Sequence, residues 1–195
     1  MDNKIVLISS SPRRRWLLET YGYDVTVVQP QSDELPHSSV PEELARENAL
    51  RKFMSVRFDG VGLAADTIVV IDGRILGKPA SIAEARAFLR TLSGRTHRVI
   101  TGYVIGRSEE PEVTSHEVTG VKFMELSEAE IEYMLRSENL LDKAGAYAIQ
   151  GSAGLFVERI EGDYSNVIGL PMPAIYRHLK KRFGILPSKW RGQRG

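Results

Sequence analysis

Near its start the chain alternates between strand-like and helix-like segments, and this order sets the fold class. Residues 5–8 form an apolar run that predicts a strand. A helix follows, because Pro12 after Ser11 is typical of a first helical turn. Another strand-like run, rich in β-branched residues, comes at Asp24–Val28. A strand, a helix and a strand in this order resemble a βαβ unit.

The middle of the chain has a different kind of connection. Asp72-Gly73 follows the strand-like run Gly62–Ile71 and is typical of the type I′ turn of a β-hairpin. Paired positions across this hairpin have numbers that sum to about 145, which brings Lys78 nearly opposite Thr67. The βαβ start and the hairpin together predict an α/β fold with a mixed, twisted sheet and flanking helices.

Other segments complete the expected elements. The strand-like runs are Lys4–Ser9, Asp24–Val28, Gly62–Ile71, Arg98–Gly106, Glu117–Met124 and Leu155–Arg159. The expected helices run from Pro12 toward Gly22, from Pro41 to about Val56, from the capping boxes at Ser81 and Ser127, and from Pro171 to Phe183. Helical spacing assigns four further side chains to the core: Trp16, Tyr133, Met134 and Leu135.

The composition is that of a globular protein, with 42% hydrophobic and 26% charged residues in a chain of 195. We expect one domain over residues 1–186 and a basic, flexible tail over residues 187–195. The chain has no cysteine, which excludes disulfides, thiolate metal ligands and cysteine nucleophiles. It has neither a signal-peptide pattern nor an apolar stretch of the ~18 residues needed to span a membrane, so a cytoplasmic location is expected.

Positive charge gathers toward the C-terminal end. Residues 164–195 carry seven Lys or Arg and no acidic residue, although the net charge of the chain is only +1. Such a segment can contact nucleic acid or a membrane, but basic residues at this density are more often a solvated face. Neither partner is therefore expected.

The stretch SSSPRRRW, residues 9–16, places three arginines in the first turn of the first helix. Backbone N–H groups already put partial positive charge at a helix N-terminus, so Arg13, Arg14 and Arg15 are unfavourable there without an anion. Together with Ser9 they form a predicted anion site. The alternative is that these arginines reach back to carboxylates such as Glu19.

Asp66 interrupts the apolar run Gly62–Ile71. A carboxylate is costly to bury unpaired, so Asp66 binds a cation, accepts hydrogen bonds or faces a cleft at a strand end. A plainer alternative is that it caps backbone N–H groups. Lys78 follows the hairpin, and Glu34 lies in a polar loop where a solvated turn is the plainer interpretation. An anion site, a lysine and carboxylates suit phosphate and a hard cation, which points to a phosphoester or nucleotide function.

Six motifs lie between residue 4 and about residue 184. They are Ser9-x-Ser-Pro-Arg-Arg14, Ala65-Asp66-Thr67, Gly77-Lys78-Pro79, Leu92-Ser-Gly-Arg-Thr-His97-x-Val-x-Thr101, Asp142-Lys-Ala-Gly-Ala-Tyr-Ala-Ile-Gln-Gly151 and Val167-Ile-Gly-Leu-Pro171. Together and in this order they closely resemble the Maf family of nucleoside triphosphate pyrophosphatases, once named septum formation inhibitors. The resemblance implies an elongated, two-lobed α/β fold with a central cleft, like that of the inosine triphosphate pyrophosphatases. It also implies a homodimer.

The same resemblance implies a reaction and a set of roles. The reaction is hydrolysis of a nucleoside triphosphate to the monophosphate and pyrophosphate, with Mg²⁺ or Mn²⁺. Asp66 matches the general base, and Glu34 and Asp66 match the metal ligands. The residues that match the phosphate-binding groups are Ser9, Arg13, Arg14, Glu34 and Lys78. Those that match the positions separating the substrate branches of the family are Arg13, Thr67 and Gln150.

Gln150 points to the substrate. Its motif resembles that of the dTTP/UTP enzymes, whereas a relative that acts on 7-methyl-GTP carries Glu at this position. A carboxamide has both a donor and an acceptor, so it can pair with the N3–H and a carbonyl of uracil or thymine. The alternatives are an enzyme for another or modified nucleotide, of the inosine or 7-methyl-GTP type, and a non-catalytic nucleotide-binding regulator of septum formation. For the enzyme, the expected role is removal of unwanted nucleotides or one linked to division.

The second predicted helix departs from the family pattern. Members that resemble this chain carry Lys, a proposed phosphate contact, where Asn48 stands here. Lys52 lies four residues on, one turn along the same helix face, and its stem is long enough to turn back toward the site. Lys52 is therefore a predicted substitute for the missing lysine, and Arg51 points elsewhere.

Overall fold

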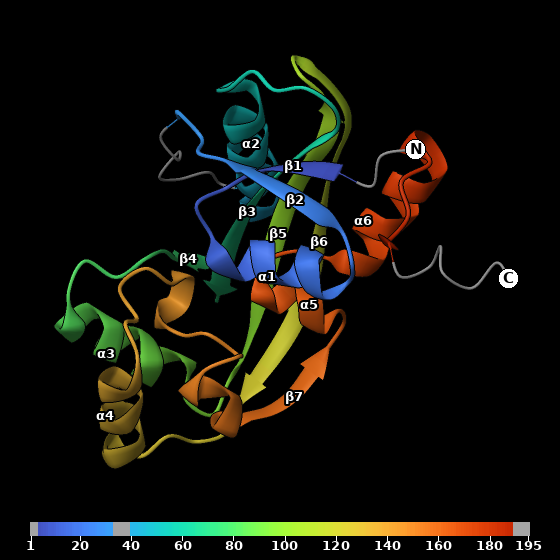
Figure 1. The fold of residues 1–195 in the computed structure, drawn as a ribbon. Coiled ribbons are helices and arrows are strands. Elements are labelled where there is room, and N and C mark those ends of the chain that lie inside the picture. Colours follow the sequence, from blue (N-terminus) through green and yellow to red (C-terminus); the bar gives the residue numbers. More distant parts are fainter. Residues whose placement is uncertain (1–3, 33–39, 189–195) are drawn as a thin grey trace, which may run out of the picture. The chain divides into compact units, whose positions relative to one another are not determined.

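The protein was analysed as a computed structural model that describes residues 4–32 and 40–188. Seven strands form one mixed sheet with the order β2-β1-β3-β5-β6-β7, and β4 pairs with β3 (Figure 1). The strands are β1 Lys4–Ile8, β2 Asp24–Val28, β3 Gly62–Ile71, β4 Arg74–Leu76, β5 Thr96–Arg107, β6 Glu110–Phe123 and β7 Val157–Glu161. Strand β1 is parallel to β2 and β3, whereas β4 and β7 pair antiparallel. The predicted α/β fold with a mixed sheet is confirmed.

Six α-helices accompany the sheet in the described part of the chain. They are α1 Pro12–Thr20, α2 Pro41–Met54, α3 Ile82–Leu92, α4 Glu128–Ser137, α5 Tyr164–Ile168 and α6 Met172–His178. The capping box at Ser127 is complete, because Ser127 and Glu130 each accept from the other's backbone N–H. At α3, Ser81 accepts from the Glu84 backbone, while the Glu84 carboxylate binds the N–H of Ala80. None of these helices is long and apolar enough to cross a membrane.

The chain divides into two compact units. The first comprises Met1–Asp66, Thr101–Glu117 and Gly169–Gly195, and the second comprises Thr67–Ile100 and Val118–Ile168. Strand β3 crosses from the first unit to the second between Asp66 and Thr67. The cleft between two lobes, the single domain over residues 1–186 and the dimer stay predictions.

The first unit has its core under α2. Ala49 and Phe53 of that helix pack with Ile8, Ala64 and Val104, which come from β1, β3 and β5. These side chains are fully buried, and burial of apolar area of this kind is the main favourable contribution to folding. The face of α2 that meets the sheet is thereby fixed.

The second unit has an aromatic core and a pair of helices at its surface. The rings of His97, Phe123 and Tyr147 meet edge to face, with centroids 5.0–5.4 Å apart. Helices α3 and α4 lie side by side (Figure 1). Arg90 of α3 binds both carboxylate oxygens of Glu128 of α4, at 2.8 and 2.9 Å.

Several boundaries differ from those expected from the sequence. Strand β6 begins at Glu110 rather than at residue 117, because its polar first half, which includes Pro111, becomes a strand only by lying beside β5 in the sheet. Leu155 belongs to a 3₁₀ turn, and β7 follows it from Val157. The last predicted helix is α6 followed by a wider turn of five residues, which ends at Gly184 with φ of +64°.

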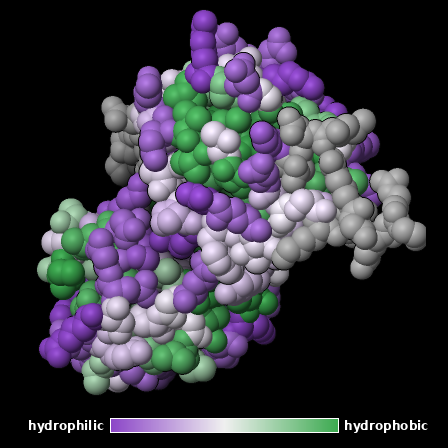
Figure 2. Space-filling model, viewed as in Figure 1, coloured by the Kyte–Doolittle hydropathy of each residue, from purple (hydrophilic) through white to green (hydrophobic). Residues whose placement is uncertain are grey.

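Two side chains assigned to the core are exposed. Trp16 and Tyr133 keep 48% and 50% of their surface, whereas Met134 is fully buried and Leu135 is half-buried. Trp16 lies off the helix face that buries Leu17 of α1, and helical spacing alone does not show which face meets the sheet. Apolar residues indeed appear among hydrophilic ones on the face drawn in Figure 2.

Candidate functional site

Ser9 and Arg14, two residues of the predicted anion site, bind each other. Ser9 follows the last residue of β1 and is buried, and its Oγ accepts from Nη1 of Arg14 at 3.2 Å and from the backbone N–H of Ser11 at 3.1 Å. Nε of Arg14 donates to the carbonyl of Gly169 at 2.9 Å. Ser11 occupies the cap position of α1, but its side chain makes no capping bond there. The serine hydroxyl that organises this turn is therefore that of Ser9.

The three arginines of α1 have different surroundings. Arg15 is exposed and forms an ion pair with Glu19 at 2.7 Å, so the alternative of a local carboxylate holds for Arg15. Arg14 is buried against Ser9 and Gly169 instead, and Arg13 is half-buried. The first turn of α1 contains no acidic residue. Guanidinium groups and the N–H groups of this helix end therefore concentrate positive charge where an anion would be stabilised.

Asp66 lies within β3 and is 5% exposed. Its Oδ1 is 2.6 Å from Nζ of Lys52, and its Oδ2 accepts from Nδ2 of Asn48 at 3.2 Å. These donors compensate the burial of the carboxylate. Of the alternatives that the sequence leaves open, hydrogen bonding with a cationic partner is correct. The interpretation as a cap of backbone N–H groups is wrong, because side chains of α2 supply these donors.

Helix α2 presents Asn48 and Lys52 because of their spacing. They stand four residues apart on the face that also buries Ala45, Ala49 and Phe53. Two polar residues on an otherwise apolar helix face are the signal of a buried polar site, and Lys52 keeps only 7% of its surface. The structure places the Lys52 ammonium on Asp66, so it is not a solvated side chain.

The register of β1 and β3 brings the Ser9–Arg14 pair and Asp66 to neighbouring positions. Ile8 pairs with Ala64 in this parallel ladder. One residue further, Ser9 is level with Ala65 and therefore beside Asp66. The first unit thus gathers Ser9, Arg14 and Asp66 near the carboxyl end of β1.

Thr67, Lys78 and Gln150 belong to the second unit. The hairpin register is as predicted, with Ile71 opposite Arg74, and Asp72 and Gly73 both have positive φ, as a type I′ turn requires. The expectation that Lys78 lies nearly opposite Thr67 stays a prediction, because the paired register ends at Val69 and Leu76. Strand β4 ends at Leu76, and the next carbonyl, that of Gly77, accepts from the N–H of Gly145 at 3.1 Å.

Gln150 lies in a turn, and its side chain is exposed. The backbone before it is buried from Gly145 to Ile149, and the turn is closed by a bond from the N–H of Gly151 to the carbonyl of Ala148 at 3.0 Å. An exposed carboxamide on a fixed turn is available to a ligand.

Tyr147 and His97 stay in the core. Nε2 of His97 is 2.7 Å from the hydroxyl of Tyr147, and His97 is 1% exposed. Burial lowers the pKa of His97 from 6.5 to about 4 and raises the pKa of Tyr147 above its usual range. These contacts order the region around His97, and Tyr147 packs in the core rather than at the surface.

Two predictions fall outside the described residues. Glu34, a predicted ligand of metal and phosphate, lies between residues 32 and 40, and all but the first two residues of the predicted tail lie beyond residue 188. Within residues 4–32 and 40–188, no group of three or more His, Cys, Asp or Glu side chains is placed to hold a metal ion. Of the two predicted metal ligands, Glu34 and Asp66, the structure therefore describes Asp66.

Comparison with known proteins identifies the family. A family model described as Maf-like protein matches residues 4–182. The chain is 47% identical over 173 residues to a dTTP/UTP pyrophosphatase of Symbiobacterium thermophilum, covering 87% of this chain and 89% of the relative. It is 48% identical over 184 residues to one of Thermococcus gammatolerans, covering 93% and 98%, and 44% identical over 182 residues to one of Bacillus cereus, covering 91% and 89%.

Solved structures give weaker matches. A HAM1 protein of Coxiella burnetii is 19% identical with a TM-score of 0.43, covering 63% of this chain and 73% of the other. The Ham1 protein of Staphylococcus aureus is 14% identical with a TM-score of 0.44, covering 62% and 71%. The sequence matches extend over nearly the whole chain, and on them the chain belongs to the Maf-like protein family.

Proposed function

We propose that this protein is a nucleoside triphosphate pyrophosphatase that hydrolyses dTTP and UTP to the monophosphate and pyrophosphate. Relatives that bear the name dTTP/UTP pyrophosphatase, at 43–48% identity over most of the chain, support this proposal. The observation that carries it is the buried Asp66 carboxylate beside the Ser9–Arg14 pair, since a base and an anion site are the two groups that phosphoanhydride hydrolysis needs.

Ser9, Arg13 and Arg14 would bind the triphosphate. A guanidinium donates two parallel hydrogen bonds to phosphate oxygens, and the N–H groups at the start of α1 add to the attraction. The contacts of Arg14 with Ser9 and Gly169 fix the direction of its guanidinium before substrate arrives. Lys78 would neutralise charge on the leaving pyrophosphate, as a flexible cation that can follow the departing group.

Asp66 would accept the proton of the water that attacks the α-phosphorus. Its two contacts to α2 hold the carboxylate in one orientation, which is what a general base needs. Lys52 and Asn48 are thus positioning residues for Asp66. Lys52 lies on the same helix face as Asn48, the position where relatives of this family carry a lysine. Its ammonium would also add positive charge close to the phosphates.

A divalent cation fits this donor set. An ionised carboxylate has about four lone-pair sites, and the two bonds from Lys52 and Asn48 occupy one on each oxygen of Asp66. Mg²⁺ is commonly held by one or two carboxylates together with substrate phosphates, which matches Asp66 and Glu34 as the ligands. When bound, such a cation neutralises charge that develops on the phosphate oxygens.

Gln150 with Thr67 and Arg13 would select the base. The exposed carboxamide of Gln150 can donate to a carbonyl and accept from N3–H of thymine or uracil. A carboxylate at this position would suit the N1–H and N2–H donors of guanine but would lack the donor that a pyrimidine carbonyl needs, so the amide of Gln150 favours a pyrimidine. Discrimination of this kind is strong when a buried polar group loses its partner.

A panel of nucleotides tests the proposal. Pyrophosphate release is measured from dTTP, UTP, CTP, GTP, ITP and 7-methyl-GTP, each with Mg²⁺, with Mn²⁺ and with excess chelator. We expect dTTP and UTP to have the highest kcat/KM and the chelator to abolish turnover. A preference for ITP or 7-methyl-GTP would reject the pyrimidine assignment. If no nucleotide were turned over, the remaining hypothesis would be a non-catalytic protein that binds nucleotides.

A further inference from the structure

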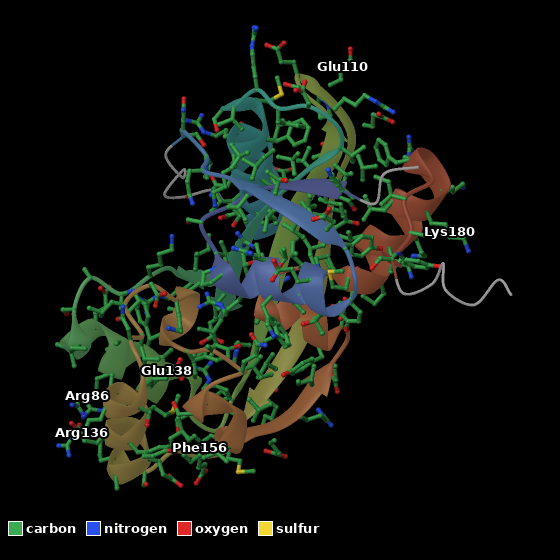
Figure 3. All side chains as sticks on the ribbon, viewed as in Figure 1. Arg86, Glu110, Arg136, Glu138, Phe156 and Lys180 are labelled. Carbon is green, nitrogen blue, oxygen red and sulfur yellow. The ribbon has the colours of Figure 1, made fainter. Side chains whose placement is uncertain are left out.

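Glu138, labelled in Figure 3, follows the last residue of α4. It contacts the backbone just after Gln150. Its Oε1 accepts from the backbone N–H of Ser152 at 3.0 Å and from Oγ of Ser152 at 3.1 Å. The approach to Gly151 is so close that a Cβ there would lie 1.9 Å from Oε1 of Glu138. Only glycine allows this carboxylate to reach the turn.

The second oxygen of Glu138 faces the other end of the same segment. Oε2 lies 3.6 Å from Nζ of Lys143, whose side chain is 9% exposed. That ammonium also donates to Oδ1 of Asp142 at 2.8 Å and to the carbonyl of Asn139. Glu138 therefore joins the start of the segment 143–152 to its end with one side chain.

The rest of the segment is tied down by other contacts. The N–H of Gly145 donates to Gly77, and Tyr147 binds His97 in the core. Gln150 has a buried neighbour, Ile149, on one side and Gly151 on the other. On the C-terminal side of Gln150, the side chain of Glu138 reaches across from the end of α4 and contacts residues 151 and 152.

We propose that Glu138 is a positioning residue for base recognition: it holds the turn that carries Gln150 so that the carboxamide stands ready for the pyrimidine edge. This inference rests on the proposed function, because it assigns the base contact to Gln150. A carboxylate suits the task because one oxygen accepts from Ser152 while the other faces the Lys143 ammonium. A displacement of about 1 Å at such a site can cost up to ~10²-fold in rate.

The test compares four variants in the full-length enzyme. Glu138→Ala removes both contacts, and Glu138→Gln keeps the acceptor for Ser152 but loses the charge facing Lys143. Gly151→Ala keeps the carboxylate and drives it from the turn. The matched control is Glu132→Ala on the same helix, since Glu132 pairs with Arg86 and Arg136.

The readout is KM and kcat for dTTP and for dGTP. Glu138→Ala and Gly151→Ala should lower the dTTP:dGTP ratio of kcat/KM about 10-fold, mainly through the KM for dTTP, and Glu138→Gln should lie between them and wild type. Glu132→Ala should keep the wild-type ratio. In a Gln150→Ala background, Glu138→Ala should add no further loss, because both changes then act on one contact.

Hydrogen exchange tests the contact without turnover. The amides of residues 151 and 152 should exchange faster in Glu138→Ala than in wild type, and those of α3 should not change. An unchanged dTTP:dGTP ratio in a folded Glu138→Ala or Glu138→Gln enzyme, or unchanged exchange at these amides, would overturn the role of Glu138. Failure of the wild-type enzyme to hydrolyse dTTP would instead overturn the proposed function.

Discussion

The ammonium of Lys52 lies 2.6 Å from Oδ1 of Asp66, and both residues are buried. The pair joins α2 to β3 inside the first unit. A buried ion pair contributes little net stability compared with apolar residues, but loss of one partner leaves an uncompensated charge. The pair therefore ties the stability of the first unit to the group that we propose as the base.

Replacement of Lys52 should harm both stability and catalysis. Lys52→Ala removes the cation that faces Asp66, so the free energy of unfolding should fall by about 3–5 kcal/mol. The KM for dTTP should rise severalfold, because Asp66 loses its fixed orientation and the site loses positive charge. Denaturant unfolding and steady-state kinetics measure the two effects. Arg51→Ala, at the exposed neighbouring position, is the control and should change little.

A lysine at position 48 should restore much of this loss. Asn48 already reaches Oδ2 of Asp66 at 3.2 Å from one turn earlier on the same helix face. Asn48→Lys in the Lys52→Ala background therefore places an ammonium within reach of the carboxylate. If Lys52→Ala matched wild type in stability, kcat and KM, the ion pair would have no role in the enzyme.

Asp66→Asn should stop turnover. An amide cannot accept the proton of the attacking water, and removal of a general base costs about 10²–10⁴-fold in kcat. The variant should still fold, as circular dichroism would show, with a lower melting temperature, because Lys52 no longer faces a carboxylate. Asp59→Asn, at an exposed position ahead of β3, serves as the control. Half of wild-type activity in Asp66→Asn would mean that another group is the base.

Gln150→Glu should lower activity on pyrimidine nucleotides by more than a change of one atom suggests. The carboxylate would face a carbonyl of the base as a second acceptor, and an unpaired polar contact costs about 1–3 kcal/mol, or roughly 5- to 150-fold in kcat/KM. Kinetics on dTTP, UTP and GTP measure the change in preference. Unchanged constants for both pyrimidine nucleotides would remove Gln150 from the base site.

His97 should make stability depend on pH. Its pKa falls from 6.5 to about 4 in the folded protein because of burial, so between these values the unfolded chain binds a proton that the folded protein does not. This contribution is complete above pH 6.5 and is lost as the pH falls toward 4, by about 3 kcal/mol in total. Unfolding measured from pH 7 to pH 4 should show a smaller loss in His97→Gln. An equal loss in both proteins would show that His97 is not buried in its neutral form.

Local patterns were sufficient for β2, β3 and the turn of the hairpin. The bounds of β3, Gly62–Ile71, follow from its largely apolar run, which Asp66 interrupts, and the type I′ turn fixed the register that pairs Ile71 with Arg74. Lys78 lies beyond this register, which ends at Leu76. The length of a ladder depends on what the next backbone groups meet, and the carbonyl of Gly77 meets Gly145.

Contacts between segments far apart in the chain could not be predicted from the sequence. Asp66 was identified as a costly buried charge, but its partners come from a helix whose inward face is decided by packing, as the exposure of Trp16 also shows. Glu138 carried no signal, because an acidic residue at a helix end is ordinarily solvated. Its contacts exist only because the chain returns to α4 at Gly151 and Ser152.

Hydrolysis of dTTP in H₂¹⁸O tests the central claim most directly, because it reports which phosphorus the water attacks. If Asp66 and the Ser9–Arg14 site direct water to the α-phosphorus, mass spectrometry will find dTMP with one ¹⁸O atom and unlabelled pyrophosphate. Formation of dTDP and phosphate, or of unlabelled dTMP with labelled pyrophosphate, would contradict this account.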